Sequence, residues 1–111
     1  AMPIINKNEK MSKALITMTK KSFGCLGVLD NKKNIIGIIT DGDLRRNINS
    51  KFIEKTASEI MTKNPSIGSR KMLVGEALNI MNNKKITSLF ICEKRKPIGI
   101  IHIHDLLRLT S

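Results

Sequence analysis

The feature that most constrains the fold of this chain is an internal repeat. A shift of 63 residues aligns the first half of the sequence with the second, and a one-residue deletion in a loop changes the shift to 62. The matching pairs are Ala14/Ala77, Leu15/Leu78, Met18/Met81, Lys21/Lys84, Leu26/Leu89, Val28/Ile91, Ile36–Ile39/Ile98–Ile101, Asp43-Leu44/Asp105-Leu106 and Arg46/Arg108. One unit of about 45 residues is too small to bury a good core alone, so we expect two similar units packed together.

Both repeats predict the same order of elements. A short apolar segment (residues 3–5 and 66–67) precedes apolar residues at helical spacing, including Ala14 and Ala77. Two strand-like runs follow, each pair separated by a polar loop of about five residues, which favours an antiparallel hairpin. These runs are residues 25–29 and 35–39, then 88–92 and 98–101. A second helix begins near Asp41 and near Ile103. The predicted fold class is α+β, with two β-α-β-β-α units packed together.

The repeat also predicts the domain boundaries. We assign the first unit to residues 1–50, a linker segment to residues 51–63 and the second unit to residues 64–111. The second repeat is preceded by residues 56–62, and the matching segment for the first repeat would lie before Ala1. We therefore expect the first unit to be truncated at its N-terminus and the chain to come from a longer protein.

Composition and charge narrow the class of protein. No apolar run approaches the roughly 18–20 residues of a membrane span, and the N-terminus has no apolar signal region. Cys25 and Cys92 lie far apart in apolar segments, which favours reduced thiols in a core. We expect a cytoplasmic protein without a membrane partner.

The net charge of +11 admits two interpretations. One is nucleic-acid binding through phosphate neutralisation, which predicts a steep loss of affinity with salt. The other is compositional bias, since 15 Lys against 5 Arg, 10 Asn, 18 Ile and 4 Ala suit an AT-rich coding background. Only 3 aromatic residues are present to stack on bases. We expect no nucleic-acid partner, although the charge favours an anionic ligand.

The most informative motif is the segment from Gly37 to Asp43, where a strand ends at Thr40 and a helix begins. Backbone N–H groups at a helix start favour an anion, and a carboxylate one turn later can accept hydrogen bonds from two ribose hydroxyls. A capping box of Thr40 and Asp43 is the purely structural alternative. The second repeat keeps Asp105 although His102 replaces the threonine, which hints at a role for the acid beyond capping.

The motif Gly-x-x-Thr-x-x-Asp at the close of such a unit resembles the adenosine-nucleotide signature of CBS domains. The resemblance implies that Asp43 holds the ribose hydroxyls and that Thr40 lies beside the phosphates. In the second repeat Asp105 matches the acid, and His102 is the departure from the pattern. The resemblance implies a tandem CBS pair, whose two β-α-β-β-α units pack sheet to sheet in pseudo-twofold symmetry. Such a pair is a small-molecule-sensing regulatory module with two ligand clefts.

A closer resemblance rests on residues 40–46, 85–89 and 102–108, and it covers essentially the whole chain. These segments are similar to the C-terminal half of bacterial D-arabinose 5-phosphate isomerases, which carry a sugar isomerase (SIS) domain before a CBS pair. The resemblance implies a partner SIS domain, a homo-oligomer, and a place in Kdo synthesis for lipopolysaccharide or capsule. The catalytic domain is not in this sequence, so we expect no enzymatic activity and no catalytic residue here.

Other candidate residues have two interpretations each. Arg46, with Arg45 and Arg108, either reaches ligand phosphates or lies on a solvated helix face. Thr87, with Ser88, either contacts the ligand or supplies hydrogen bonds at a strand start. Two histidines at alternate strand positions would face one side and suggest a metal, but no further ligand cluster stands out, so we predict none.

Two hypotheses for the function follow. The first is a ligand-sensing module that needs no cofactor and binds AMP, ATP or another adenosine nucleotide, or the nucleotide sugar CMP-Kdo. The predicted ligand-binding residues are Thr40, Asp43, Arg46, Thr87, His102 and Asp105. The second is a structural module that binds no ligand and holds the enzyme oligomer together.

Overall fold

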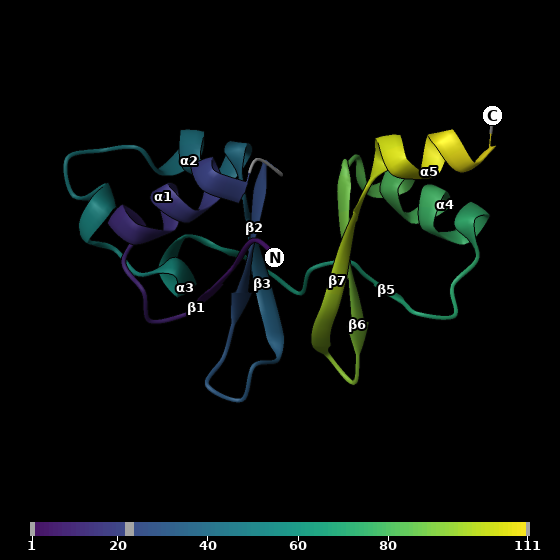
Figure 1. Ribbon diagram of the computed structural model, residues 1–111. Helices are drawn as coiled ribbons and strands as arrows, with labels where there is room; N and C mark the ends of the chain where they lie inside the picture. Colours follow the sequence, from purple (N-terminus) through teal and green to yellow (C-terminus); the bar gives the residue numbers. More distant parts are fainter. Residues whose placement is uncertain (1, 22–23, 111) are drawn as a thin grey trace. The chain divides into compact units, whose positions relative to one another are not determined.

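The computed structural model describes residues 2–21 and 24–110. The chain divides into two compact units, Ala1–Pro65 and Ser66–Ser111 (Figure 1). Each unit contains one sheet with its helices, so the predicted α+β class and the two repeated units are confirmed.

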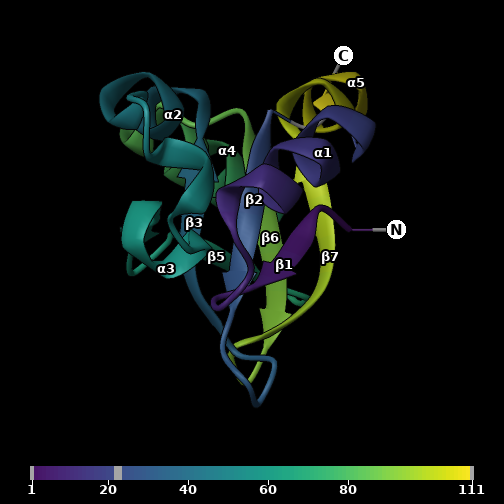
Figure 2. The ribbon, with the colours of Figure 1, turned by 90° about the vertical axis from the view of Figure 1, so that its left-hand side faces the viewer.

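The first unit contains a sheet of four strands in the order β1-β2-β3-β4. Its elements are β1 (Ile4–Asn6), α1 (Met11–Lys21), β2 (Cys25–Leu29), β3 (Ile35–Thr40), α2 (Asp41–Asn47), the 3-10 helix η1 (Phe52–Glu54), α3 (Ala57–Ile60) and β4 (Thr62–Lys63). Strand β1 pairs with β2 in parallel, and the remaining pairs are antiparallel. Helices α1 and α3 lie on one face of this sheet (Figure 2).

The core of the first unit follows the predicted helical spacing. Met11, Ala14 and Met18 lie one helical turn apart on α1 and are buried against Leu26 and Val28 of β2. Burial of these aliphatic side chains contributes most of the stability of a unit that contains so few aromatic residues.

The predicted linker at residues 51–63 forms secondary structure that belongs to the first unit. Phe52, Ala57 and Ile60 are buried in the same core cluster as α1 and β2. Lys63 and Thr62 of β4 pair with Gly37 and Ile38 on the outer edge of β3. The segment before the second repeat therefore completes the first unit.

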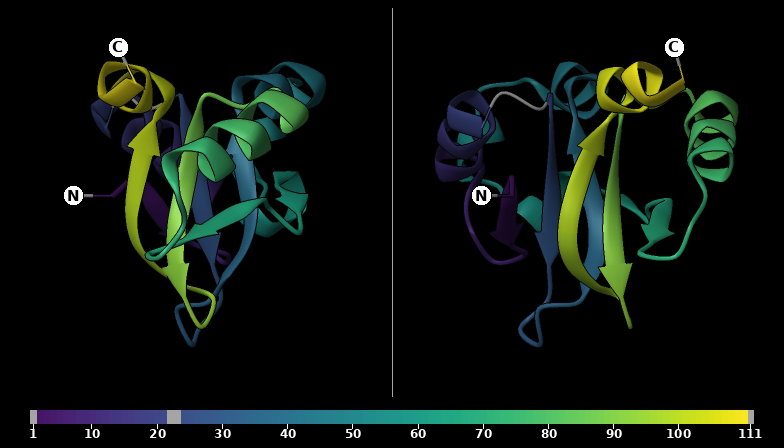
Figure 3. Two further views of the ribbon diagram at one scale, coloured as in Figure 1. Left: turned by 90° about the vertical axis from the view of Figure 1, so that its right-hand side faces the viewer. Right: turned by 45° about the vertical axis from the view of Figure 1, so that its right-hand side comes forward.

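The second unit contains a sheet of three strands in the order β5-β6-β7 (Figure 3). Its elements are β5 (Ile67–Ser69), α4 (Val74–Lys84), β6 (Ser88–Glu93), β7 (Lys96–His102) and α5 (Ile103–Thr110). Ala77 and Met81 of α4 pack with Leu89 of β6 and Leu106 of α5 in its core. The equivalent core positions in the two units confirm the alignment of the repeat.

The two hairpins differ in their turns. The β2–β3 loop runs from Asp30 to Asn34 as predicted, and one carboxylate oxygen of Asp30 accepts hydrogen bonds from the Lys32 and Asn34 N–H groups, both at 2.9 Å. The prediction of a similar loop in the second hairpin was wrong, because its turn contains only Lys94 and Arg95. Both residues have positive φ, 50° and 68°. This is the geometry of a tight type I′ turn, whose backbone twist matches that of the strands.

The cysteines and the lengths of the helices bear on two predictions from the sequence. Cys25 and Cys92 are both buried thiols, as predicted. Within residues 2–21 and 24–110, none of the helices is both long enough and apolar enough to cross a membrane.

Candidate functional site

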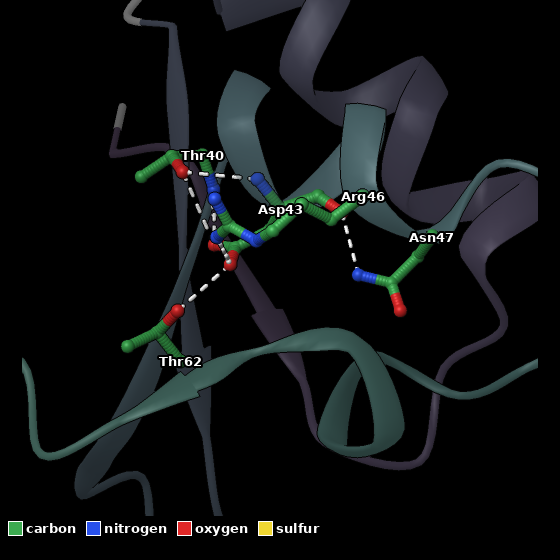
Figure 4. A network of polar contacts seen from close by, with 5 residues as sticks. All are labelled: Thr40, Asp43, Arg46, Asn47 and Thr62. Atoms are coloured by element: carbon green, nitrogen blue, oxygen red, sulfur yellow. Dashed lines mark hydrogen bonds and ion pairs between the residues drawn. The ribbon is translucent and has the colours of Figure 1, made fainter.

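The candidate site lies where β3 ends and α2 begins. Thr40 keeps an extended backbone (φ −115°, ψ 171°) and caps α2. Its hydroxyl accepts a hydrogen bond from the Asp43 N–H at 3.3 Å, and Oδ2 of Asp43 accepts one from the Thr40 N–H at 2.9 Å. The Thr40 hydroxyl also donates to Oδ2 at 3.1 Å. The predicted capping box is therefore present (Figure 4).

The other carboxylate oxygen of Asp43 has different partners. Oδ1 accepts hydrogen bonds from the Arg46 guanidinium at 2.6 Å and from the Thr62 hydroxyl at 2.7 Å. Asn47 donates a further hydrogen bond, at 2.6 Å, to the backbone carbonyl of Asp43. Figure 4 shows these groups together, and we call Thr40, Asp43, Arg46 and Thr62 the Asp43 centre. The centre joins β3, α2 and β4.

Burial and hydrogen bonding act on Asp43 in opposite directions. Asp43 is only 3% exposed, and this burial by itself raises the pKa of the carboxyl. Hydrogen bonds from the Thr40 N–H, the Thr62 hydroxyl and the Arg46 guanidinium outweigh it and hold the pKa of Asp43 below its ordinary value. The site therefore contains a carboxylate that stays ionised at neutral pH.

The two oxygens of Asp43 differ in what they can do chemically. Oδ2 is committed to the cap of α2, whereas Oδ1 faces Arg46, whose side chain is 68% exposed. The exposed guanidinium can leave Oδ1 when another donor takes its place, because only an unpaired charge on the buried Asp43 carboxylate would be costly. A ligand hydroxyl could then donate to Oδ1, and the displaced guanidinium would be available for an anionic group.

The second repeat builds a similar but more open arrangement. The His102 N–H donates to Oδ2 of Asp105 at 3.4 Å, and Arg108 forms an ion pair with Oδ1. Nδ1 of His102 accepts a hydrogen bond from the His104 N–H at 3.2 Å, so the imidazole replaces the threonine hydroxyl at the start of α5. The Asp105 side chain is 50% exposed. The acid retained in this repeat thus lies at the surface.

The structure places the six predicted residues in two groups. Thr40, Asp43 and Arg46 come together in the first unit. His102 and Asp105 come together in the second, beside Thr87, whose carbonyl accepts a hydrogen bond from the Ile103 N–H at 2.8 Å.

His102 and His104 stack with ring centroids 4.7 Å apart. Within the part of the chain that the structure describes, no group of three or more His, Cys, Asp or Glu side chains could hold a metal ion.

Sequence reasoning missed Thr62. This residue lies 19 positions from Asp43 in the sequence, in a strand of only two residues, and has no counterpart in the motif. The only available signal was the position of residues 56–62 before the second repeat, which the prediction treated as a linker.

Comparison with known proteins identifies the family. The CBS domain family model matches residues 1–50 and 57–111. The chain is 50% identical over 106 residues to uncharacterized protein RP505 of Rickettsia prowazekii. It is 34% identical over 109 residues to arabinose 5-phosphate isomerase KdsD of Salmonella typhi. Each match covers 96% of this chain and 33% of the relative, so the chain spans about a third of the length of these relatives.

A solved structure, CBSX2 in complex with AMP, has the same fold. It superposes with a TM-score of 0.86 at 22% identity, over 98% of this chain and 87% of that one. Both predicted resemblances, to CBS pairs and to arabinose 5-phosphate isomerases, are thus confirmed at the level of sequence similarity. The matched residues leave no part of the chain for a sugar isomerase domain. The chain therefore belongs to the CBS domain family and consists of a pair of CBS domains.

Proposed function

We propose that this CBS pair is the ligand-sensing regulatory part of a D-arabinose 5-phosphate isomerase, and that its ligand is an adenosine nucleotide or a nucleotide sugar such as CMP-Kdo. The observation that carries the proposal is the Asp43 centre. It contains a buried, ionised carboxylate, and one oxygen of this carboxylate lies beside an exposed arginine. Identity of 34% to KdsD supports the choice of parent enzyme, and the neighbour solved with AMP supports a nucleotide.

The geometry suggests how the residues would bind such a ligand. A ribose hydroxyl would donate to Oδ1 of Asp43 and take the place that the Arg46 guanidinium now occupies. Arg46, still tethered to α2, would turn toward the phosphate, which it can bind through two parallel hydrogen bonds. Thr40 would stay in the cap and keep the carboxylate in position. In the second unit Asp105, His102 and Thr87 would form the corresponding site.

Regulation requires more than binding. A ligand shifts an enzyme between two states only if it binds one state more tightly than the other. In the Asp43 centre Thr62 is the second donor to Oδ1, it lies in the strand before the second repeat, and the other hydroxyl of the ribose diol would compete with it. Its displacement from Oδ1 would release one of the contacts that hold β4. We propose that the change reaches the partner isomerase domain within a cytoplasmic homo-oligomer that takes part in Kdo synthesis.

A structural role without a ligand is the second candidate. The observation that favours it is the complete set of partners on Asp43, whose two oxygens accept hydrogen bonds from Thr40, Arg46 and Thr62. Such a carboxylate is already stabilised without a ligand. The pair would then serve to hold the enzyme oligomer together.

A thermal-shift screen separates the two candidates. The panel contains AMP, ADP, ATP, CMP, CMP-Kdo, arabinose 5-phosphate and S-adenosylmethionine. A ligand at about 100 times its Kd adds roughly 2.7 kcal/mol to stability, which raises Tm by several degrees in a domain of this size. We expect such a shift with a nucleotide or CMP-Kdo.

Matched variants place the ligand in one unit or the other. Arg46→Ala removes an exposed side chain from the Asp43 centre, and Arg108→Ala makes the equivalent change in the second unit. Loss of the shift in the Arg46→Ala variant, with the shift kept in Arg108→Ala, would support binding at Asp43. No shift with any ligand would favour the structural role.

A further inference from the structure

The two repeats cap the helix that follows their hairpin with different groups. In the first unit the Thr40 hydroxyl accepts a hydrogen bond from the Asp43 N–H, and a hydroxyl keeps its charge at physiological pH. In the second unit Nδ1 of His102 accepts one from the His104 N–H at 3.2 Å. Histidine is the side chain whose charge changes between about pH 5 and pH 8. The second unit therefore caps α5 with a group that can gain a proton in this range.

The proton on the His102 ring decides whether the ring can act as a cap. A neutral imidazole has one N–H donor and one bare nitrogen that accepts. Because Nδ1 accepts from the His104 N–H, the proton of the neutral ring lies on Nε2. In the imidazolium form both nitrogens are donors, so Nδ1 can no longer accept. Protonation of His102 is therefore incompatible with the hydrogen bond that caps α5.

The helix itself also opposes a positive charge at this position. His102 is the last residue of β7 and directly precedes α5, into which the strand runs (Figure 1). The first turn of a helix presents backbone N–H groups and the positive end of the helix dipole. The backbone of His102 pairs with Ser88 of β6, so the ring can turn away while the strand stays in place.

An acceptor for the protonated ring lies close by. The Asp105 carboxylate is half exposed, and its Oδ2 accepts only a long hydrogen bond, of 3.4 Å, from the His102 N–H. Its Oδ1 forms an ion pair with Arg108. A ring that turns toward this carboxylate gains a charge-assisted hydrogen bond. The start of α5 thus has two discrete arrangements, one for the neutral ring and one for the charged ring.

The charged groups around His102 leave this exchange to α5 itself. His104 stacks on the His102 ring, with ring centroids 4.7 Å apart, so two charged imidazoles would repel each other. Ser88, the partner of His102 on β6, carries no charge. The other charged residues of the elements that pack with β7 and α5 are Glu76, Lys84, Glu93 and Lys96, with Lys85 at the C-cap of α4. The two residues of this set that come just before Ser88 are lysines, so Asp105 is the carboxylate that a protonated His102 can reach.

We propose that His102 is a pH-sensitive cap of α5. The neutral ring holds the His104 N–H and fixes the first turn of the helix. When the ring takes up a proton from the solvent, it releases this N–H and donates to the Asp105 carboxylate, where it competes with Arg108. The first turn of α5 then opens, and Asp105 has fewer acceptor positions for a ligand hydroxyl. The first unit has no such switch, because Thr40 stands at the equivalent position.

This inference goes beyond the proposed function. It concerns a hydrogen bond within the second unit, so it does not depend on whether the pair binds a nucleotide. Its consequence for binding is a difference between the units, since only the site at Asp105 would change with pH in this range.

The composition of the chain makes the titration of each ring separable. The chain contains 2 histidines, so His104→Ala leaves His102 as its only imidazole and keeps the backbone N–H at position 104. His102→Thr supplies the capping residue of the first repeat and leaves His104 as the only imidazole. Neither side chain is buried, so both variants should fold.

An NMR titration from pH 8 to pH 5 measures the switch. In the His104→Ala chain we expect the amide proton signal of position 104 to move with the same midpoint as the signals of the His102 ring, because one proton controls both. The Nε–H signal of Arg108 should move with them, since the charged ring competes for Asp105. The amide signals of residues 40–43 should stay in place, because their cap does not titrate.

Thermal unfolding supplies a second measurement. The neutral form of His102 stabilises α5, so this contribution is present at high pH and is lost as pH falls. We expect the Tm of the native chain to fall by a few degrees more between pH 8 and pH 5 than that of His102→Thr, because loss of a cap is costly and an exposed ion pair replaces little of it. His104 is present in both proteins, so its titration does not contribute to the difference.

Two results would overturn the proposal. One is an amide signal of position 104 that stays in place in the His104→Ala chain while the His102 ring titrates. The other is an equal fall of Tm with pH in the native and His102→Thr proteins.

Discussion

Two aspartates with the same place in the repeat have different surroundings. Asp43 is buried and accepts hydrogen bonds from four donor groups, which lie on Thr40, Arg46 and Thr62. Asp105 is half exposed, and its carboxylate accepts hydrogen bonds from the His102 N–H and from Arg108 in the described chain. Sequence similarity at a site residue therefore does not imply the same strength of interaction. What differs is Thr62 of β4, whose hydroxyl donates to Asp43, while the partners of Asp105 in the described chain come from its own helix and the residue before it.

The surroundings of Asp43 predict that the stability of the fold depends on pH. Because its folded pKa lies below the ordinary value of 3.8, its ionised form stabilises the fold above that pH, and this contribution is lost as pH falls through the folded pKa. We expect the free energy of unfolding of the native chain to fall more between about pH 6 and pH 3 than that of the Asp43→Asn variant. Urea unfolding at each pH measures the difference.

The matched control for this prediction is Asp105→Asn, which removes one carboxylate from an exposed site in the other repeat. Between the same pH values, we expect the free energy of unfolding of the Asp105→Asn variant to fall by nearly as much as that of the native chain. Equal acid dependence in the native and Asp43→Asn proteins would contradict the role of the hydrogen bonds around Asp43.

At the scale of elements, strand β4 accounts for the difference in packing around the equivalent glycines of the two units. Its two residues lie along β3, and Met61 directly before them covers Gly37. The glycine is thus needed for close approach, not for an unusual backbone conformation. Gly99, its equivalent on β7, has no such neighbour in the described chain.

This difference predicts unequal effects of the same substitution. Gly37→Ala forces its new methyl group against Met61 and should destabilise the first unit by about 1–3 kcal/mol, the usual cost of overpacking. Gly99→Ala should change stability by no more than about 0.5 kcal/mol, as most surface substitutions do. Chemical denaturation of both variants measures the difference.

A double variant tests the cause. Met61→Ala should remove much of the penalty of Gly37→Ala, because the methyl group then has space. Equal destabilisation by Gly37→Ala and Gly99→Ala, or no relief by Met61→Ala, would show that packing between β4 and β3 is not the reason for the glycine.

The sequence predicts the elements that rest on local patterns. Helical spacing of apolar residues located α1 and α4, short apolar runs separated by polar loops located both hairpins, and the Thr40–Asp43 spacing predicted the capping box. Segments stabilised by distant contacts were not predicted. Strand β4 is too short to show a period, and the tight turn at Lys94-Arg95 lacks the Asn or Gly that normally marks positive φ. Thr62 reaches Asp43 only through tertiary packing.

At the scale of the molecule, the chain is a CBS pair about a third as long as the relatives that it matches. Its net charge of +11 favours anionic ligands over cationic ones. In each unit the spacing shared by the two repeats places an acid and an arginine one helical turn apart. The proposed nucleotide would bring both a diol for the acid and a phosphate for the arginine.

The most direct test of nucleotide sensing is an NMR titration of the native chain with AMP and, separately, with CMP-Kdo. We predict saturable shifts of the amide signals of residues 40–46 and of Thr62 with one of the two ligands, because both segments contact Oδ1 of Asp43. The absence of saturable shifts in these segments at millimolar concentrations of either ligand would contradict binding at Asp43 and leave Thr40 and Asp43 as a helix cap.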